Sequence, residues 1–222
     1  MTRIALLIPF LFSNALIAAV IADSAGEFSL TQGQNNWFYG YYKGPFTPVG
    51  FTQMTVTNGN SWVVDIETTI TPEHYWTTLS STRAHGNGIV TSGGRTPQEH
   101  WAVRRWVSEV TGPVVISGTL LRGQNNTGGN GIVGRIFAGN QEVLTEVVLN
   151  TDFLSHSFSI PINVIAGQNI DFALDPSAAN DHSDTTEFTA MISDPVPEPA
   201  TWLMISGTML CHFAYRRALG VG

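Results

Sequence analysis

The 222-residue chain has one cysteine, Cys211, and one lysine, Lys43. A single cysteine cannot form an intramolecular disulfide, so the fold must be stabilised by burial and backbone hydrogen bonds. Charged residues make up 12% of the chain, and ten basic against seventeen acidic residues give a net charge of −7. A chain this acidic repels phosphate backbones, which excludes a nucleic-acid-binding protein.

Sequence motifs of common catalytic sites are also missing. The chain has no Gly-x-Ser-x-Gly elbow, no His-Glu-x-x-His zinc motif and no phosphate-binding loop. Carboxylates such as Glu99 and Glu109 could pair for glycoside hydrolysis only if the fold brings them together. We therefore expect a protein without enzymatic activity, and a glycan-active hydrolase is the alternative.

The C-terminus has three distinct parts. Pro197 and Pro199 flank Glu198 and keep it out of a helix interior or a central strand. An apolar run over residues 200–215 follows, and then the basic pair Arg216 and Arg217. At 1.5 Å per residue this run reaches about 24 Å, so it needs snorkelling arginines or bilayer thinning to cross a membrane. A buried terminal element of the globular domain is the alternative.

This arrangement resembles the PEP-CTERM sorting signal of Gram-negative envelope proteins. The resemblance covers residues 194–222 and implies processing by an exosortase, an integral-membrane enzyme. It also implies that the chain is anchored in the inner membrane through its C-terminus before processing, and then reaches the envelope, the surface or the extracellular matrix. Cys211 lies within the apolar run, where a small hydrophobic role is favoured over lipidation.

Residues 1–22 have the pattern of a secretory leader for the Sec translocon. Arg3 supplies the positive charge, residues 4–21 are largely apolar, and small residues precede a cleavage site between Ala22 and Asp23. An uncleaved signal anchor is the alternative. With Arg216 and Arg217 on the cytoplasmic side, the positive-inside rule places the intervening domain outside the inner membrane.

The exported part, residues 23–193, has the pattern of an all-β domain. Phe158, Ile160, Ile162 and Val164 alternate with polar residues and Pro161, which predicts an edge strand or a bulged strand. Turns are expected at residues 139–140 and 166–168. Further strands are expected at residues 114–121, 132–137, 141–149, 170–174 and 188–192. Short strands at this spacing favour an antiparallel β-sandwich.

A second resemblance extends over residues 99–192. The runs that carry it are EHWAVRRW at 99–106, GPVVISG at 112–118, GIVGRIF at 131–137, AGQNIDF at 166–172 and DTT at 184–186. Their order is similar to jelly-roll modules of secreted bacterial proteins, such as galactose-binding-like and carbohydrate-binding sandwiches. The resemblance implies a jelly-roll-like fold, and it says little about function because these runs are structural.

Aromatic residues concentrate in the first half of the exported part. They could form a platform on which sugar rings stack, or they could pack in the core on both faces of their strands. The residues considered for stacking are Trp37, Tyr39, Tyr41, Trp62 and Trp76.

One loop is rich in oxygen donors. Asp175, Asn180, Asp181 and Asp184 could bind calcium, which takes six to eight oxygen ligands. The spacing is not that of an EF-hand, and Asx turns explain the same residues. No cofactor is otherwise expected. The sequence thus predicts an exported envelope or matrix protein associated with exopolysaccharide or biofilm; the alternative is a secreted carbohydrate-binding protein.

Overall fold

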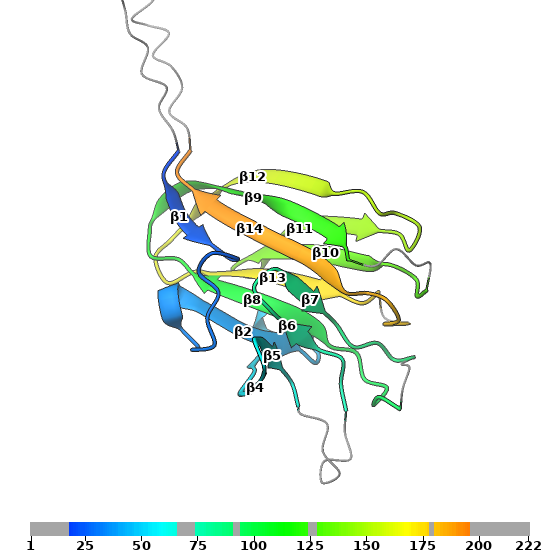
Figure 1. The fold of residues 1–222 in the computed structure, drawn as a ribbon. Helices are drawn as coiled ribbons and strands as arrows, with labels where there is room; N and C mark the ends of the chain where they lie inside the picture. Colours follow the sequence, from blue (N-terminus) through cyan, green and yellow to red (C-terminus); the bar gives the residue numbers. More distant parts are fainter. Residues whose placement is uncertain (1–17, 66–73, 91–93, 124–127, 178–179, 196–222) are drawn as a thin grey trace, which may run out of the picture. The chain divides into compact units, whose positions relative to one another are not determined.

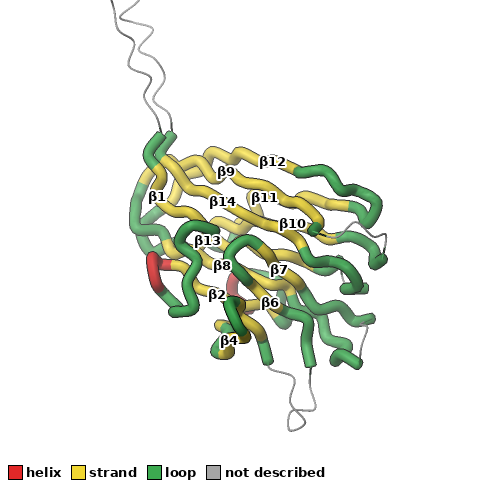
Figure 2. The backbone as a smooth tube through the Cα atoms, viewed as in Figure 1, coloured by secondary structure: helices red, strands yellow, loops and turns green. Residues whose placement is uncertain are grey.

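Alternating apolar and polar residues fold into strands that form two antiparallel sheets. The computed structural model describes residues 18–65, 74–90, 94–123, 128–177 and 180–195, and residues Ala19–Pro195 form one compact unit. All strand pairs of the described residues are antiparallel. Figures 1 and 2 show that strands dominate the domain. The predicted all-β fold is confirmed for these residues.

Sheet A has eight strands in the described chain. In spatial order they are β12 (His156–Val164), β9 (Gly112–Arg122), β14 (Thr186–Ser193), β7 (Arg83–His85), β6 (Thr78–Leu79), β5 (Ser61–Val63) and β4 (Val56–Asn58), with β1 (Val20–Asp23) paired to β14. Sheet B has six: β11 (Gln141–Val148), β10 (Ile132–Ala138), β13 (Asn169–Asp175), β8 (Trp101–Val107), β2 (Trp37–Tyr42) and β3 (Phe51–Gln53).

The six strands expected from the sequence all form, at β9 to β14. Strand β12 is an edge strand of sheet A, as Pro161 predicts, and its apolar residues face inward along most of its length. The turn at Gly139 joins β10 to β11 as a hairpin. The turn at residues 166–168 also forms, but it connects β12 of sheet A to β13 of sheet B, so these two strands do not pair with each other.

The described residues contain no α-helix, only the short 3₁₀ turns η1 (Gln34–Asn36) and η2 (Pro48–Gly50). No helix in this part of the chain is long and apolar enough to cross a membrane. The apolar run at 200–215 and the sorting residues Pro197, Glu198, Pro199, Arg216 and Arg217 lie outside the described residues.

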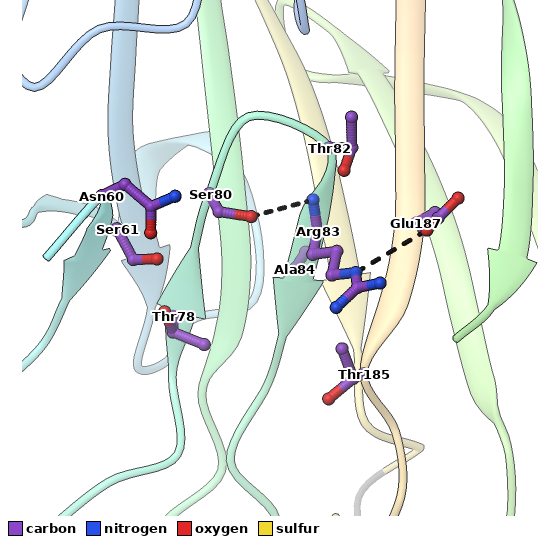
Figure 3. A pocket seen from close by; sticks show the side chains of 9 residues that line it. All are labelled: Asn60, Ser61, Thr78, Ser80, Thr82, Arg83, Ala84, Thr185 and Glu187. Atoms are coloured by element: carbon purple, nitrogen blue, oxygen red, sulfur yellow. Dashed lines mark hydrogen bonds and ion pairs between the residues drawn. The ribbon is translucent and has the colours of Figure 1, made fainter. Parts of the chain in front are cut away.

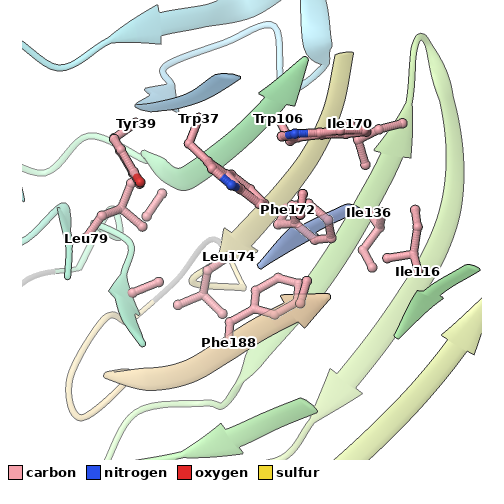
Figure 4. Close-up of a cluster of buried hydrophobic side chains, with 14 of the residues drawn as sticks. Trp37, Tyr39, Leu79, Trp106, Ile116, Ile136, Ile170, Phe172, Leu174 and Phe188 are labelled. Atoms are coloured by element: carbon pink, nitrogen blue, oxygen red, sulfur yellow. The ribbon is translucent and has the colours of Figure 1, made fainter. Parts of the chain in front are cut away.

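The two sheets enclose a core in which aromatic side chains meet across the sandwich (Figure 4). Phe172 of β13 packs edge-to-face on Phe188 of β14, with ring centroids 6.1 Å apart. Tyr39 of β2 stacks on Trp62 of β5 at 6.0 Å. Since each pair joins sheet A to sheet B, these contacts fix how the sheets pack as well as burying apolar surface.

A buried arginine also bridges the sheets. Arg104 of β8 points inward, and its guanidinium donates hydrogen bonds to the carbonyl oxygens of Phe188, Ser80 (2.7 Å) and Arg83 (3.0 Å). Burial lowers the pKa of Arg104 to about 10, so the side chain is still charged at neutral pH. Its three acceptors all belong to sheet A or to the turn between β6 and β7.

The N-terminal strand belongs to the sandwich. Ala22 is buried, β1 pairs with the end of β14, and the amide of Asp194 donates to the carbonyl of Ala19 at 2.9 Å. The predicted cleavage site between Ala22 and Asp23 lies within this strand. Cleavage stays a prediction, and a cut at that point would remove most of β1 from the sheet.

We expect a chain that begins at Asp23 to be less stable than one that begins at Ala18. It lacks the backbone hydrogen bonds of residues 19–22 and the burial of Ala22, a loss of about 2 kcal/mol. Urea unfolding of the two chains, followed by tryptophan fluorescence, measures the difference. Equal midpoints would show that β1 contributes nothing to the stability of the sandwich.

Candidate functional site

A polar hollow lies on sheet A, where β5, β6, β7 and the start of β14 come together (Figure 3). Its volume is about 430 Å³, within the range of small-ligand sites. None of the nine lining residues is aromatic. They are Asn60, Ser61, Thr78, Ser80, Thr82, Arg83, Ala84, Thr185 and Glu187.

Hydroxyl and charged groups give this hollow both donors and acceptors. Arg83 reaches across to Glu187, with 3.6 Å between Nε and Oε1 (Figure 3). The amide of Arg83 donates to the Ser80 hydroxyl at 3.3 Å, and the Thr78 hydroxyl donates to the carbonyl of Trp62 at 3.0 Å. Such groups suit a ligand that is itself rich in hydroxyls.

Trp76 precedes β6 and is not one of the nine residues that line the hollow. Burial alternates along the chain here: Thr77 and Leu79 are buried, while Trp76 is 38% exposed. This pattern indicates that Trp76 and Thr78 lie on the same side of the segment, although Trp76 itself precedes β6. The guanidinium carbon of Arg95 lies 4.2 Å from the centre of the Trp76 ring, a cation–π contact.

Asn87 holds the backbone of this segment, and sequence analysis missed it. It is fully buried; its Oδ1 accepts a hydrogen bond from the amide of Trp76 at 2.8 Å, and its Nδ2 donates to the carbonyls of Gly88, Thr96 and Gln98. Every hydrogen-bonding atom of the Asn87 amide is thus used to position its neighbours. One asparagine among many in the sequence carries no signal of this role.

Three of the aromatic residues considered for stacking pack in the core, which is the alternative that the sequence left open. Trp37, Tyr39 and Trp62 are buried in the sandwich. Their polar atoms are used internally: Trp37 Nε1 donates to Glu27 at 2.9 Å, and Trp62 Nε1 donates to the carbonyl of Ser29 at 2.9 Å. The alternation along β2 identified which residues share a face but not which face is inside.

Tyr41 is half-buried, and it packs against a buried histidine. The rings of Tyr41 and Tyr75 lie 4.6 Å and 4.4 Å from the ring of His100, measured between centroids. His100 Nδ1 lies 3.1 Å from the Thr77 hydroxyl. Burial, followed by the charge of Lys43, lowers the pKa of His100 to about 4, so this imidazole is neutral at pH 7.

We expect His100 to make the fold less stable in acid. The unfolded chain takes up a proton near pH 6.5 while the folded chain does so only near pH 4, so stability falls as pH drops through this window. The contribution is about 3 kcal/mol. Urea midpoints measured from pH 7 to pH 4 should fall less steeply in His100→Asn than in the parent chain. Parallel curves would contradict a neutral, buried His100.

The residues considered for calcium separate into two groups. Asp175 accepts from Arg135 Nε at 3.1 Å and from the amide of Ser177 at 2.6 Å, and Asn180 accepts from the amide of His182 in an Asx turn. Asp181 and Asp184 are buried. The described residues contain no group of three or more His, Cys, Asp or Glu side chains that could hold a metal ion.

Glu99 and Glu109 cannot pair for glycoside hydrolysis. They lie beyond opposite ends of β8, whose seven residues span about 23 Å. Glu99 accepts a hydrogen bond from Trp101 Nε1 at 2.6 Å, and burial raises its pKa.

Sheet B has a buried charge network on its outer face that the sequence did not reveal. Asp171 of β13 accepts two hydrogen bonds from Arg105 at 2.7 Å each, and one from the Tyr42 hydroxyl at 2.6 Å. Burial first, and then the Asp171 charge, raise the pKa of Tyr42. Because its carboxylate oxygens are satisfied internally, this network has the features of a structural ion pair.

Comparisons with known proteins leave the family open. No protein-family model matches the chain, and no curated protein matches it. A solved structure, the native structure of a family 35 carbohydrate binding module from Clostridium thermocellum, aligns over 48% of this chain and 85% of that module. The aligned residues are 13% identical and the TM-score is 0.28, a likeness too slight to carry an argument about this chain.

Proposed function

We propose that the described domain is a non-catalytic, jelly-roll-like module that binds a polysaccharide. The observations that carry this proposal are the exposed indole of Trp76 and a polar hollow lined by Thr78, two residues further along the chain. A sugar ring has an apolar C–H face and a rim of hydroxyls. An aromatic ring takes the first, and the hydroxyl and charged side chains of the hollow take the second.

Binding without hydrolysis fits this hollow better than the alternative, a hydrolase. Glycoside hydrolysis generally uses a pair of Asp or Glu residues on either side of the scissile bond. Of the nine lining residues only Glu187 is acidic, and its carboxylate faces Arg83. The net charge of −7 further favours a neutral polysaccharide over a polyanionic one.

The binding proposal predicts that Trp76→Ala weakens polysaccharide binding about tenfold, because a stacked aromatic surface is worth roughly 1.4 kcal/mol. Affinity electrophoresis of the full chain through gels that contain different neutral polysaccharides measures the retardation. Phe153→Ala is the matched control, because Phe153 is 37% exposed, lies in the loop after β11 and is not one of the residues that line the hollow.

Retardation of the parent chain and of Phe153→Ala, with loss in Trp76→Ala, supports the proposal. Equal retardation of all three proteins would show that binding does not depend on Trp76. No retardation in any gel would contradict polysaccharide binding.

We also propose, from the sequence alone, that the protein is an exported envelope or matrix component sorted through its C-terminus. The Pro197-Glu198-Pro199 motif, the apolar run at 200–215 and Arg216-Arg217 support this. The partners would be the Sec translocon, the inner membrane and an exosortase-type enzyme. In this scheme the sandwich attaches the processed protein to exopolysaccharide.

The sorting proposal predicts that replacing Pro197, Glu198 and Pro199 with alanine leaves export intact but prevents removal of the apolar tail. Mass spectrometry of the C-terminal peptide from the exporting host distinguishes the two forms. The same mature C-terminus in parent and mutant would contradict recognition of this motif.

A further inference from the structure

Two buried carboxylates next to β14 lack the partners that such groups need. Asp184 is 0% exposed, and neither of its carboxylate oxygens has a hydrogen-bond partner in the part of the chain that the structure describes. Asp181 is 1% exposed; its Oδ2 accepts from the amide of Gly88 at 3.0 Å, while its Oδ1 has no partner. Buried carboxylates are normally paired, protonated or bound to a metal ion, because an unpaired charge is costly to bury.

Other oxygens gather beside Asp184. Gly129 has a left-handed backbone with a φ of +74°, and a side chain at this position would collide with these oxygens. The point where its Cβ would stand lies within 3.4 Å of Asp184 Oδ1 and of the carbonyl oxygens of His182 and Asn180. Three oxygens from one short segment therefore gather against the backbone of Gly129, where any larger residue would collide with them.

The nearby arginine does not pair with Asp184. Arg122 is buried, and its guanidinium donates to carbonyl oxygens instead: those of Asn150, Ser183 (3.0 Å) and Gly128 (3.4 Å). Burial raises the pKa of Asp184 to about 8; Arg122 opposes this rise, and the Asp181 charge adds to it. Among the described residues, Asp184 therefore makes no ion pair with Arg122, the arginine whose charge acts on it.

We propose that Asp181, Asp184 and the carbonyl oxygens of Asn180 and His182 bind a divalent cation of the calcium type. All these ligands are hard oxygens, which suits Ca²⁺ better than Zn²⁺, because protein zinc sites are built mainly from His nitrogen and Cys sulfur ligands. Backbone carbonyls in an irregular loop favour Ca²⁺ over Mg²⁺, which demands near-ideal octahedral geometry. Water completes the coordination.

A cation here would hold together segments that are distant in sequence. Asp181 bonds the amide of Gly88, and the site abuts Gly129. The residue after Asp184 is Thr185, which lines the polar hollow. The cation site does not rest on the proposed polysaccharide function, and each can fail while the other holds.

Titration of the chelator-treated full chain with CaCl₂, followed by calorimetry, tests the proposal. We expect one equivalent of Ca²⁺ to bind, and the melting temperature to rise by about 5 °C at a hundredfold excess over the dissociation constant. Mg²⁺ should bind at least tenfold more weakly. The absence of any calcium-dependent heat or melting shift at 10 mM CaCl₂ would overturn the proposal, as would equal affinity for both ions.

Three variants locate the site. Asp184→Asn and Asp181→Asn should each weaken Ca²⁺ binding at least tenfold. The matched control Asp152→Asn, which changes the same charge in the loop after β11, should bind Ca²⁺ like the parent chain. In chelator, Asp184→Asn should melt no lower than the parent, because the carboxyl group it replaces has no hydrogen-bond partner among the described residues. Parent-like Ca²⁺ binding in both site variants would place the ion elsewhere and overturn the assignment.

Discussion

The cross-sheet hydrogen bonds of Arg104 are the constraint on which the hollow depends. Strands β6 and β7 have two and three residues, too few for their own ladders to hold them firmly. Strand β14 pairs with β7 over only two residues. At this weak junction Arg104 binds the carbonyls of Ser80 and Arg83, whose side chains line the hollow. Arg104, which belongs to sheet B, therefore fixes the geometry of the hollow on sheet A.

The buried guanidinium of Arg104 carries a large desolvation free energy. A buried guanidinium without a carboxylate partner is tolerated only where carbonyl dipoles replace water, and each carbonyl left unsatisfied would cost about 1–3 kcal/mol. The aromatic contacts between the sheets supply the compensating burial. The apolar core thus offsets the desolvation of Arg104. Burial of this core also stabilises the sandwich in place of a disulfide, which a chain with one cysteine cannot form within itself.

The sequence predicted the second half of the domain well, because β9 to β14 are long enough for their alternation to show. It did not predict β3 to β7, whose two or three residues carry no readable period. Alternation also could not tell that Trp37 faces the core while Trp76 reaches solvent, since that depends on the partner sheet and on Asn87. The buried bonds of Arg104 join residues up to 84 positions apart, beyond any local pattern.

The pairing of β1 with β14 places both ends of the described domain at one pole, since Val20 lies opposite Ser193. The hollow lies at the other end of β14, about 20 Å away. Tension applied between the two ends would act across the β1–β14 ladder and break its hydrogen bonds one after another, starting from the chain ends. Tension from one end alone would spare that ladder, so the domain is mechanically suited to a single tether.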